Sequence, residues 1–172
     1  MRRAILYTAC CLLLTACGND PGPQRAANRE GKTAKDSALL AMMEVNQRLA
    51  EEADREILQQ VQADTLHRYA QCEQGAWVAR VTQLPESEQP KMGEPVAVSM
   101  RIRTLDGELL QDIEGEYVLG RGEMPLGIEY AIRELRRGEE GIILAPWHAA
   151  FGVDGTDNIV PYSNVRIEIT IQ

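Results

Sequence analysis

The chain has 172 residues, of which 44% are hydrophobic, 26% charged and 5% aromatic, and its formal charge at pH 7 is -8. This length suits one ordinary domain with extensions and excludes a two-lobed, doubly wound enzyme, while the composition excludes a wholly disordered chain or a fibrous repeat. The acidic balance also argues against nucleic acid as a partner, because affinity for nucleic acid comes largely from Lys and Arg side chains that neutralise phosphates.

The first residues form a predicted export signal. A basic start, Met1 to Arg3, precedes the uncharged apolar run Ala4 to Leu14. This run is too short for a membrane-spanning helix of about 20 residues but has the proportions of a secretory signal. The next residues, Leu14-Thr15-Ala16-Cys17, resemble the lipobox of bacterial lipoproteins. The alternatives are a simple signal peptide and a short buried helix.

The lipobox resemblance implies a signal peptide over residues 1–16 and a lipid, such as palmitate, on Cys17. It places the protein in the bacterial cell envelope, bound to a membrane through its N-terminal lipid. Because Gly18 rather than Asp follows Cys17, we expect the outer membrane, on its periplasmic or its surface side. Export leaves Cys72 without an intramolecular partner, so we expect no disulfide and interpret Cys72 as a small buried residue rather than a nucleophile.

A tether and a helix are predicted next. Residues 17–36 hold Gly, Pro, Asn and mixed charge without apolar periodicity, which predicts a flexible tether. Over residues 37–70 an amphipathic helix is predicted, because apolar residues recur at steps of three or four: Met42, Val45, Leu49, Ala53, Ile57 and Val61. Such a stripe needs a covering surface. We favour packing on the helix's own domain, and a homodimer through helix 37–66 stays open.

After Gly75 the apolar period becomes two. Residues 95–104 and 165–172 alternate apolar with polar side chains and predict half-buried antiparallel strands. Weaker strands are predicted over residues 77–83, 108–112, 116–119 and 141–145, with a hairpin turn at Asp106-Gly107. One helix interrupts them, with apolar residues at Ile128, Ala131, Ile132 and Leu135 and a stop at Gly138. The fold class is therefore α+β: an antiparallel sheet wrapped around one short helix, preceded by the N-terminal amphipathic helix.

Several short motifs occur in a fixed order in residues 75–172. They are Lys91 to Gly93, Asp106-Gly107, the stretch Leu119 to Glu129, Ala145-Pro146-Trp147, Ala150-Phe151-Gly152 and Val160-Pro161. This order resembles the FKBP-type peptidyl-prolyl isomerases, in which a strand ending in Leu-Gly, a pocket-floor turn, a helix, a strand ending at Pro, an Ala-Tyr-Gly segment and an Ile-Pro turn follow one another. The resemblance implies an FKBP-like domain over residues 75–172 and a rotamase that assists protein folding by isomerising X-Pro bonds of exported polypeptides.

Such a reaction breaks no bond. The barrier to rotation about an amide is about 20 kcal/mol, and the twisted amide is less polar than the planar one, so a dry apolar pocket favours it. We therefore expect neither a cofactor nor a metal. His67 and His148 are the two histidines, and neither has a Cys or carboxylate cluster at metal-ligand spacing.

The resemblance assigns pocket positions residue by residue. It implies catalytic positions at Phe151, Met124, Pro125 and Ile128, and substrate-binding positions at Met100, Leu110, Gln111, Val160 and Ile167. Trp147 joins the substrate-binding set because it precedes the Ala-Phe-Gly segment. This chain departs from the family where Phe151 replaces a Tyr and Gln111 replaces an Asp. Nearly every pocket position keeps an apolar residue, whereas most of the aromatic side chains that line the family's pocket are replaced by aliphatic or Met side chains.

This pattern leaves three functions open, of which two concern the pocket. In the first, a softer pocket lined by aliphatic and Met side chains accepts a prolyl ring. In the second, Met100 and Met124 fill the pocket, and the domain is a catalytically silent module that binds peptides or scaffolds a membrane complex, with helix 37–66 as its docking face. A fold retained for an unrelated partner on the acidic surface is a third reading. We favour the isomerase.

Overall fold

The computed structural model describes residues 24–172, with side chains from residue 34 onward. The predicted signal peptide and the lipidation site Cys17 lie outside the described residues. The chain divides into two compact units, one ending at Met42 and the other spanning Met43–Gln172. The second unit contains every strand and the last part of the first helix.

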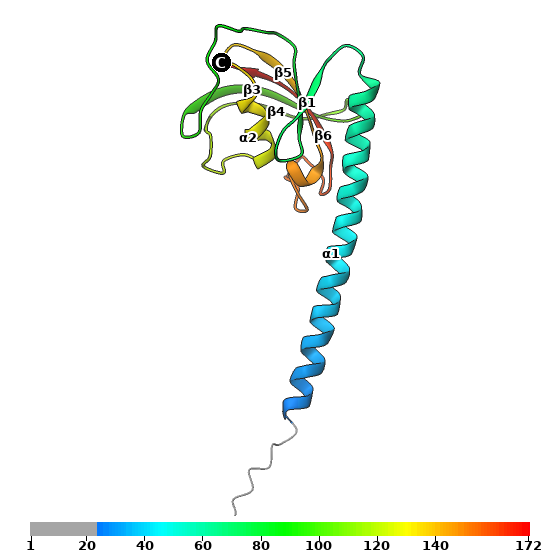
Figure 1. Cartoon of the computed structure of the whole chain (residues 1–172). Coiled ribbons are helices and arrows are strands. Elements are labelled where there is room, and N and C mark those ends of the chain that lie inside the picture. Colours follow the sequence, from blue (N-terminus) through cyan, green and yellow to red (C-terminus); the bar gives the residue numbers. More distant parts are fainter. Residues whose placement is uncertain (1–23) are drawn as a thin grey trace, which may run out of the picture. The chain divides into compact units, whose positions relative to one another are not determined.

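A single six-stranded sheet forms the body of the second unit (Figure 1). Its strands are β1 (Tyr69–Gln71), β2 (Trp77–Arg80), β3 (Pro95–Thr104), β4 (Leu109–Val118), β5 (Glu140–Ala145) and β6 (Val165–Ile171). Their order across the sheet is β1-β2-β5-β6-β3-β4, and every neighbouring pair is antiparallel. The predicted antiparallel α+β fold is confirmed.

The strands β3 and β6 bury the side chains of one face and leave those of the other face half-buried or exposed, as their period-two patterns predicted. On β3 the buried residues are Val96, Val98, Met100 and Ile102, and on β6 they are Val165, Ile167, Ile169 and Ile171. The short helix α2 (Leu126–Arg133) packs on this face and contributes Ile128, Ala131 and Ile132 to the same core. The sheet therefore curls around one helix, which fixes a core face and an outer face.

Two features of the sheet differ from the sequence prediction. The stretches 108–112 and 116–119 form one strand, β4, because Gly115 continues the ladder opposite Val98 instead of interrupting it. The three-residue strand β1 and the 3₁₀-helix η1 (Trp147–Ala149) were not predicted, since segments this short carry no measurable periodicity. The Asp106-Gly107 turn does join β3 to β4, with Gly107 at a φ of 95°.

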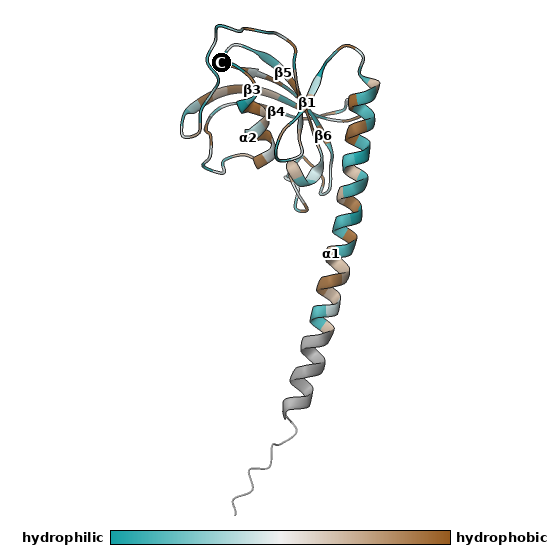
Figure 2. Ribbon diagram, viewed as in Figure 1, coloured by the Kyte–Doolittle hydropathy of each residue, from teal (hydrophilic) through white to brown (hydrophobic). Residues whose placement is uncertain are grey.

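The first helix, α1 (Gln24–Ala63), begins earlier and ends earlier than predicted. Residues 24–36, predicted as part of a flexible tether, are helical because Ala, Gln, Arg, Lys and Glu favour helix even without an apolar stripe. The helix stops before residue 70 because the Asp64 carboxylate accepts the backbone N–H groups of Leu66 and His67 at 2.9 and 3.1 Å and turns the chain. Figure 2 shows hydrophilic and hydrophobic bands alternating along its described part. Among the described residues, no helix combines the length and apolarity needed to cross a membrane.

Candidate functional site

Three of the predicted site residues form a floor on the core face. Met100 on β3, Ile128 on α2 and Ile167 on β6 are 4%, 2% and 0% exposed and belong to one core cluster. Strand register and helix packing bring them together from three elements. The floor therefore consists of well-packed aliphatic and Met side chains.

Five further predicted residues are only half-buried. Leu110, Met124 and Phe151 pack against the core cluster that contains the floor. Gln111 pairs with Ile102, which in turn pairs with Ile167, so all three lie in one row across the sheet. Pro125 is also half-buried and precedes the first residue of α2. We call these five residues the rim: Leu110, Gln111, Met124, Pro125 and Phe151.

The loop between β4 and α2 is held at both ends. The Val118 N–H donates to Glu123 Oε2 at 2.8 Å, so the loop folds back on the end of β4. The Gly120 N–H donates to Oε1 of the buried Glu129 at 3.2 Å, which attaches the loop to α2. This arrangement sets Met124 and Pro125 between β4 and the start of α2.

Trp147 and Val160 are placed differently from the other predicted residues. The Trp147 ring is 7% exposed and lies outside the core cluster, and its indole N–H donates to the Leu49 carbonyl of α1 at 3.3 Å. Val160 is 70% exposed, whereas its neighbour Ile159 is fully buried. Ile159 is therefore the residue of this turn that reaches the core.

Helix α1 holds both loops that flank Phe151. Its Asp54 contacts His148 at 2.9 Å, and its Glu56 accepts from Asn164 at 2.6 Å. Its Asn46 accepts from the hydroxyl of Tyr162, a residue with a left-handed φ of 61°. The Tyr162 N–H in turn donates to the carbonyl of Gly152 at 3.1 Å. The loop that carries Phe151 is thus linked to α1 through side chains far apart in the sequence.

One aromatic side chain that the sequence did not single out lies on the core face of β4. Tyr117 is half-buried, packs against the core and runs along the strand over Gly115. A Cβ added at Gly115 would lie 3.2 Å from Cε2 of the Tyr117 ring. A glycine inside a strand with an aromatic residue two positions later is the sequence signal that could have found this arrangement.

The titratable groups offer little chemistry to a covalent mechanism. Burial, reinforced by the negative charge of Glu134, raises the pKa of the Cys72 thiol to about 11, so the thiol stays protonated near neutral pH and is a poor nucleophile. His67 contacts Asp64 at 2.8 Å, which gives it a local structural partner. Within the described side chains no group of three His, Cys, Asp or Glu residues could hold a metal ion.

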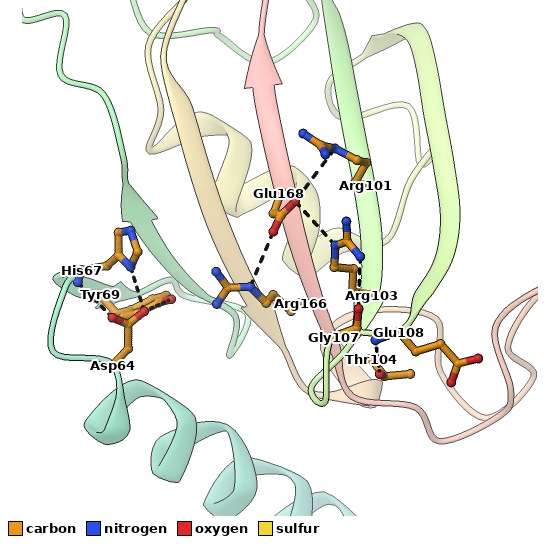
Figure 3. Close-up of polar contacts among 10 residues, drawn as sticks. All are labelled: Asp64, His67, Tyr69, Arg101, Arg103, Thr104, Gly107, Glu108, Arg166 and Glu168. Carbon is orange, nitrogen blue, oxygen red and sulfur yellow. Dashed lines mark hydrogen bonds and ion pairs between the residues drawn. The ribbon is translucent and has the colours of Figure 1, made fainter.

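The outer face carries polar contacts instead (Figure 3). Arg101, Arg103 and Arg166 surround the carboxylate of Glu168 at 3.9, 3.6 and 4.0 Å. A hollow of about 270 Å³ beside them is lined in part by Ser99, Arg101 and Glu168. Hollows of about 650 and 500 Å³ lie beside β2 and around residues 88–92. None of these three hollows is lined by a predicted site residue.

Comparisons with known proteins bear on the fold. No protein-family model and no curated protein sequence matches the chain. Among solved structures, a peptidyl-prolyl cis-trans isomerase from Pseudomonas syringae pv. tomato str. DC3000 matches with a TM-score of 0.60 at 20% identity, over 71% of this chain and 90% of that chain. The three FKBP domains of wheat FKBP73 match with a TM-score of 0.57 at 16% identity, over 61% of this chain and 49% of that chain. The chain therefore contains a domain with the FKBP-like fold, as the sequence predicted.

Proposed function

We propose that this protein is a peptidyl-prolyl cis-trans isomerase that acts on X-Pro bonds of exported polypeptides. The observation that carries the proposal is the apolar floor of Met100, Ile128 and Ile167, bordered by the half-buried rim in an FKBP-like fold. Half-buried apolar side chains beside these well-packed core residues offer a prolyl ring an apolar surface on which to pack. The isomerase named in the Pseudomonas match supports the same activity for this chain.

The proposed mechanism is selective stabilisation of the twisted amide. As the X-Pro bond turns, the amide loses resonance and its carbonyl becomes less polar, so transfer to an apolar site favours the twisted state over the planar one. A tenfold acceleration requires only about 1.4 kcal/mol of such selectivity. Phe151 supplies the aromatic wall of this site, and Met124 and Pro125 supply its aliphatic edge.

Exchange NMR on a short Ala-Leu-Pro-Phe peptide tests the proposal. The protein is the chain from Gly18 onward, which retains every described residue. We expect catalysed cis/trans exchange in the parent and a loss of at least about tenfold in Phe151→Ala, because the aromatic wall is gone. Leu109→Ala is the matched control, since Leu109 is a half-exposed apolar residue that pairs with the outer-face residue Arg103. Exchange at the uncatalysed rate in a folded parent would contradict the isomerase proposal.

A silent peptide-binding module is the second candidate. It is favoured by the near-complete burial of Met100, Ile128 and Ile167, which is also what a filled core would show, and by the absence of a hydroxyl at Phe151. Adding the same peptide and recording the NMR spectrum of the protein separates the two functions. Peptide-induced shifts at the rim without catalysed exchange would identify the module, and the absence of both would leave neither function standing.

The proposal includes attachment to the bacterial cell envelope through a lipid on Cys17. Its support is the Leu14-Thr15-Ala16-Cys17 motif behind an uncharged apolar run. Self-association through helix 37–66 stays a prediction, and five exposed apolar side chains support it: Leu39, Leu40, Met42, Met43 and Val45.

A further inference from the structure

The rim is short of hydrogen-bond donors for a peptide. Phe151 has no hydroxyl, Pro125 has no backbone N–H, and Leu110 and Met124 have no polar hydrogen on their side chains. Gln111 is the one rim residue whose side chain carries N–H groups. A peptide that enters an apolar site gives up hydrogen bonds to water, so its carbonyl groups need new donors there.

Tyr117 places a hydroxyl on the same face of the sheet. Residues 113, 115 and 117 share the core face of β4. Gly115 pairs with Val98 and Ile113 pairs with Met100, so the step from residue 117 to residue 115 leads toward Met100. The Tyr117 hydroxyl lies 3.4 Å from the position that a Cβ at Gly115 would occupy. The ring therefore runs from its own position back along the strand, and its hydroxyl is directed toward the Met100 end of the floor.

The glycine at position 115 makes this arrangement possible. A Cβ there would approach the ring at 3.2 Å, closer than ordinary van der Waals contact, so the ring would have to shift by a few tenths of an ångström. Glycine in a strand interior weakens the strand, so its presence beside a half-buried aromatic ring indicates a place where the ring is accommodated. The loop that follows β4 returns to Val118 through Glu123, so Met124 follows a contact at the C-terminal end of the strand, next to the position of Tyr117 in the chain.

The hydroxyl is available. Among the hydrogen bonds of the described side chains, none involves the Tyr117 hydroxyl, although Tyr117 is half-buried and packed against the core. Among the described side chains, its oxygen does not belong to the buried atoms that lack a partner, so it is in contact with solvent and free to donate. A ligand group or a water molecule at this position would satisfy it.

We propose that the Tyr117 hydroxyl donates a hydrogen bond to a backbone carbonyl of the bound peptide. This inference rests on the proposed function and names a substrate-binding residue for it. The acceptor is a carbonyl outside the rotating bond, since the rotating carbonyl becomes a poorer acceptor as the amide twists. The hydroxyl thus holds the peptide equally in the planar and the twisted states, which predicts an effect on KM and little effect on kcat.

The test compares two single-oxygen deletions. Tyr117→Phe removes the proposed donor. Tyr130→Phe is the matched control, since Tyr130 is also half-buried against the core but lies on α2 with its ring under the guanidinium of Arg133. We expect Tyr117→Phe to raise KM for the Ala-Leu-Pro-Phe peptide about five- to tenfold with kcat changed less than about twofold, the size of one hydrogen bond. Tyr130→Phe should match the parent.

Thermal unfolding of each variant shows whether folding is intact. A second readout avoids any dependence on stability: in the parent labelled with ¹³Cζ-tyrosine, the Tyr117 resonance should shift on peptide addition while that of Tyr130 stays in place. If the parent catalyses exchange but the Tyr117 resonance stays in place and Tyr117→Phe keeps the parental KM, the inference is wrong and the proposed function stands. A KM rise confined to Gln111→Leu would also overturn it. If the parent neither binds nor catalyses, the proposed function and this inference fail together.

Discussion

Glu129 is the side chain in the described domain whose burial is least compensated. It is 1% exposed, its Oε1 accepts one hydrogen bond from Gly120, and its Oε2 is buried without a partner. The second buried carboxylate, Glu139, is better satisfied, because Leu84 and Arg136 both donate backbone N–H groups to it and Arg80 approaches at 3.6 Å. Glu129 therefore holds the loop before α2 through its Oε1, while its unpaired Oε2 lowers the stability of the fold. Glu139 avoids this desolvation penalty.

Two substitutions at Glu129 distinguish the contribution of its hydrogen bond to stability from the contribution of its charge. Glu129→Ala should lower the free energy of unfolding by about 2–4 kcal/mol, because it leaves the Gly120 N–H unpaired and opens a cavity. Glu129→Gln keeps an acceptor for Gly120 and loses the buried charge, so its effect should stay within about 1 kcal/mol. Urea unfolding measures both, with the exposed Glu116→Ala as control. Equal losses in Ala and Gln variants would show that the charge itself matters.

At this scale the sequence predicted where three candidate residues lie, and their role in binding stays a prediction. The alternating pattern and the resemblance place Met100, Ile128 and Ile167 on one face, and the structure puts them in one core. Tyr117 was missed because a one-dimensional pattern says which face a side chain occupies and says nothing of the rotamer that carries its ring over Gly115. Ile159 was missed for a related reason, since neighbouring apolar residues in a turn give no period that selects the buried one.

The end of α1 shows how an element is stopped by side-chain chemistry. Burial alone would raise the pKa of the Asp64 carboxyl. Hydrogen bonds from the His67 side chain, from the backbone N–H groups of Leu66 and His67, and from the Tyr69 hydroxyl outweigh burial and lower the pKa to about 2. The same contact and burial raise the pKa of Tyr69 to about 12, with burial the larger cause. Figure 3 shows Asp64, His67 and Tyr69 gathered at this helix end.

The lowered pKa of Asp64 predicts an acid-dependent stability. Its folded pKa lies below the unfolded value of 3.8, so the stabilisation is present above about pH 4 and is lost as the pH falls toward 2. The loss should amount to about 2 kcal/mol, since one pKa unit corresponds to about 1.4 kcal/mol and the side chain is 17% exposed. Denaturant unfolding between pH 2 and 6 should show this slope in the parent and a smaller slope in Asp64→Asn. Asp106→Asn, at an exposed turn, is the control, and a slope unchanged by Asp64→Asn would contradict the prediction.

Elements with a clear period were predictable, and the others were not. The bounds of β3 match the prediction, β6 ends one residue before the predicted end at Gln172, and α2 ends at Arg133, well before the predicted stop at Gly138. Alternation and i, i+3, i+4 spacing report burial directly, which is why the apolar positions of these elements were predictable. The start of α1 was wrong because residues 24–36 have helix propensity without an apolar face. Strand β1 was missed because its pairing with β2, and not its own three residues, defines it.

At the scale of the whole molecule, the compact unit is larger than the FKBP-like motifs suggest. It begins at Met43, upstream of the predicted domain start at residue 75. Ala53 and Ile57 on α1 are 4% and 0% exposed, and four side-chain contacts join α1 to the loops around Phe151. The last turns of α1 are therefore part of the folded domain and support the segments nearest the proposed site.

Attachment to a membrane is the prediction that concerns the whole protein. Expressed in a bacterium from Met1, the parent should fractionate with membranes and incorporate labelled palmitate, and Cys17→Ser should do neither, because a lipobox without its cysteine cannot be acylated. Cys72→Ser is the matched control, since it removes a thiol that lies far from the motif. Palmitate incorporation that persists in Cys17→Ser would rule out the predicted site.

The Cys72 thiol is a chemical probe of local opening at the β1 edge of the sheet. Cys72 closes the turn between β1 and β2, with its N–H donating to the Ala76 carbonyl at 2.7 Å and its own carbonyl accepting from Gly75 at 3.1 Å, and it is the single cysteine after Cys17. Burial and a pKa raised to about 11 slow the reaction of this thiol with a disulfide reagent until this edge of the sheet separates. The rate of labelling at Cys72 therefore reports how often strand β1 detaches while the rest of the domain stays folded.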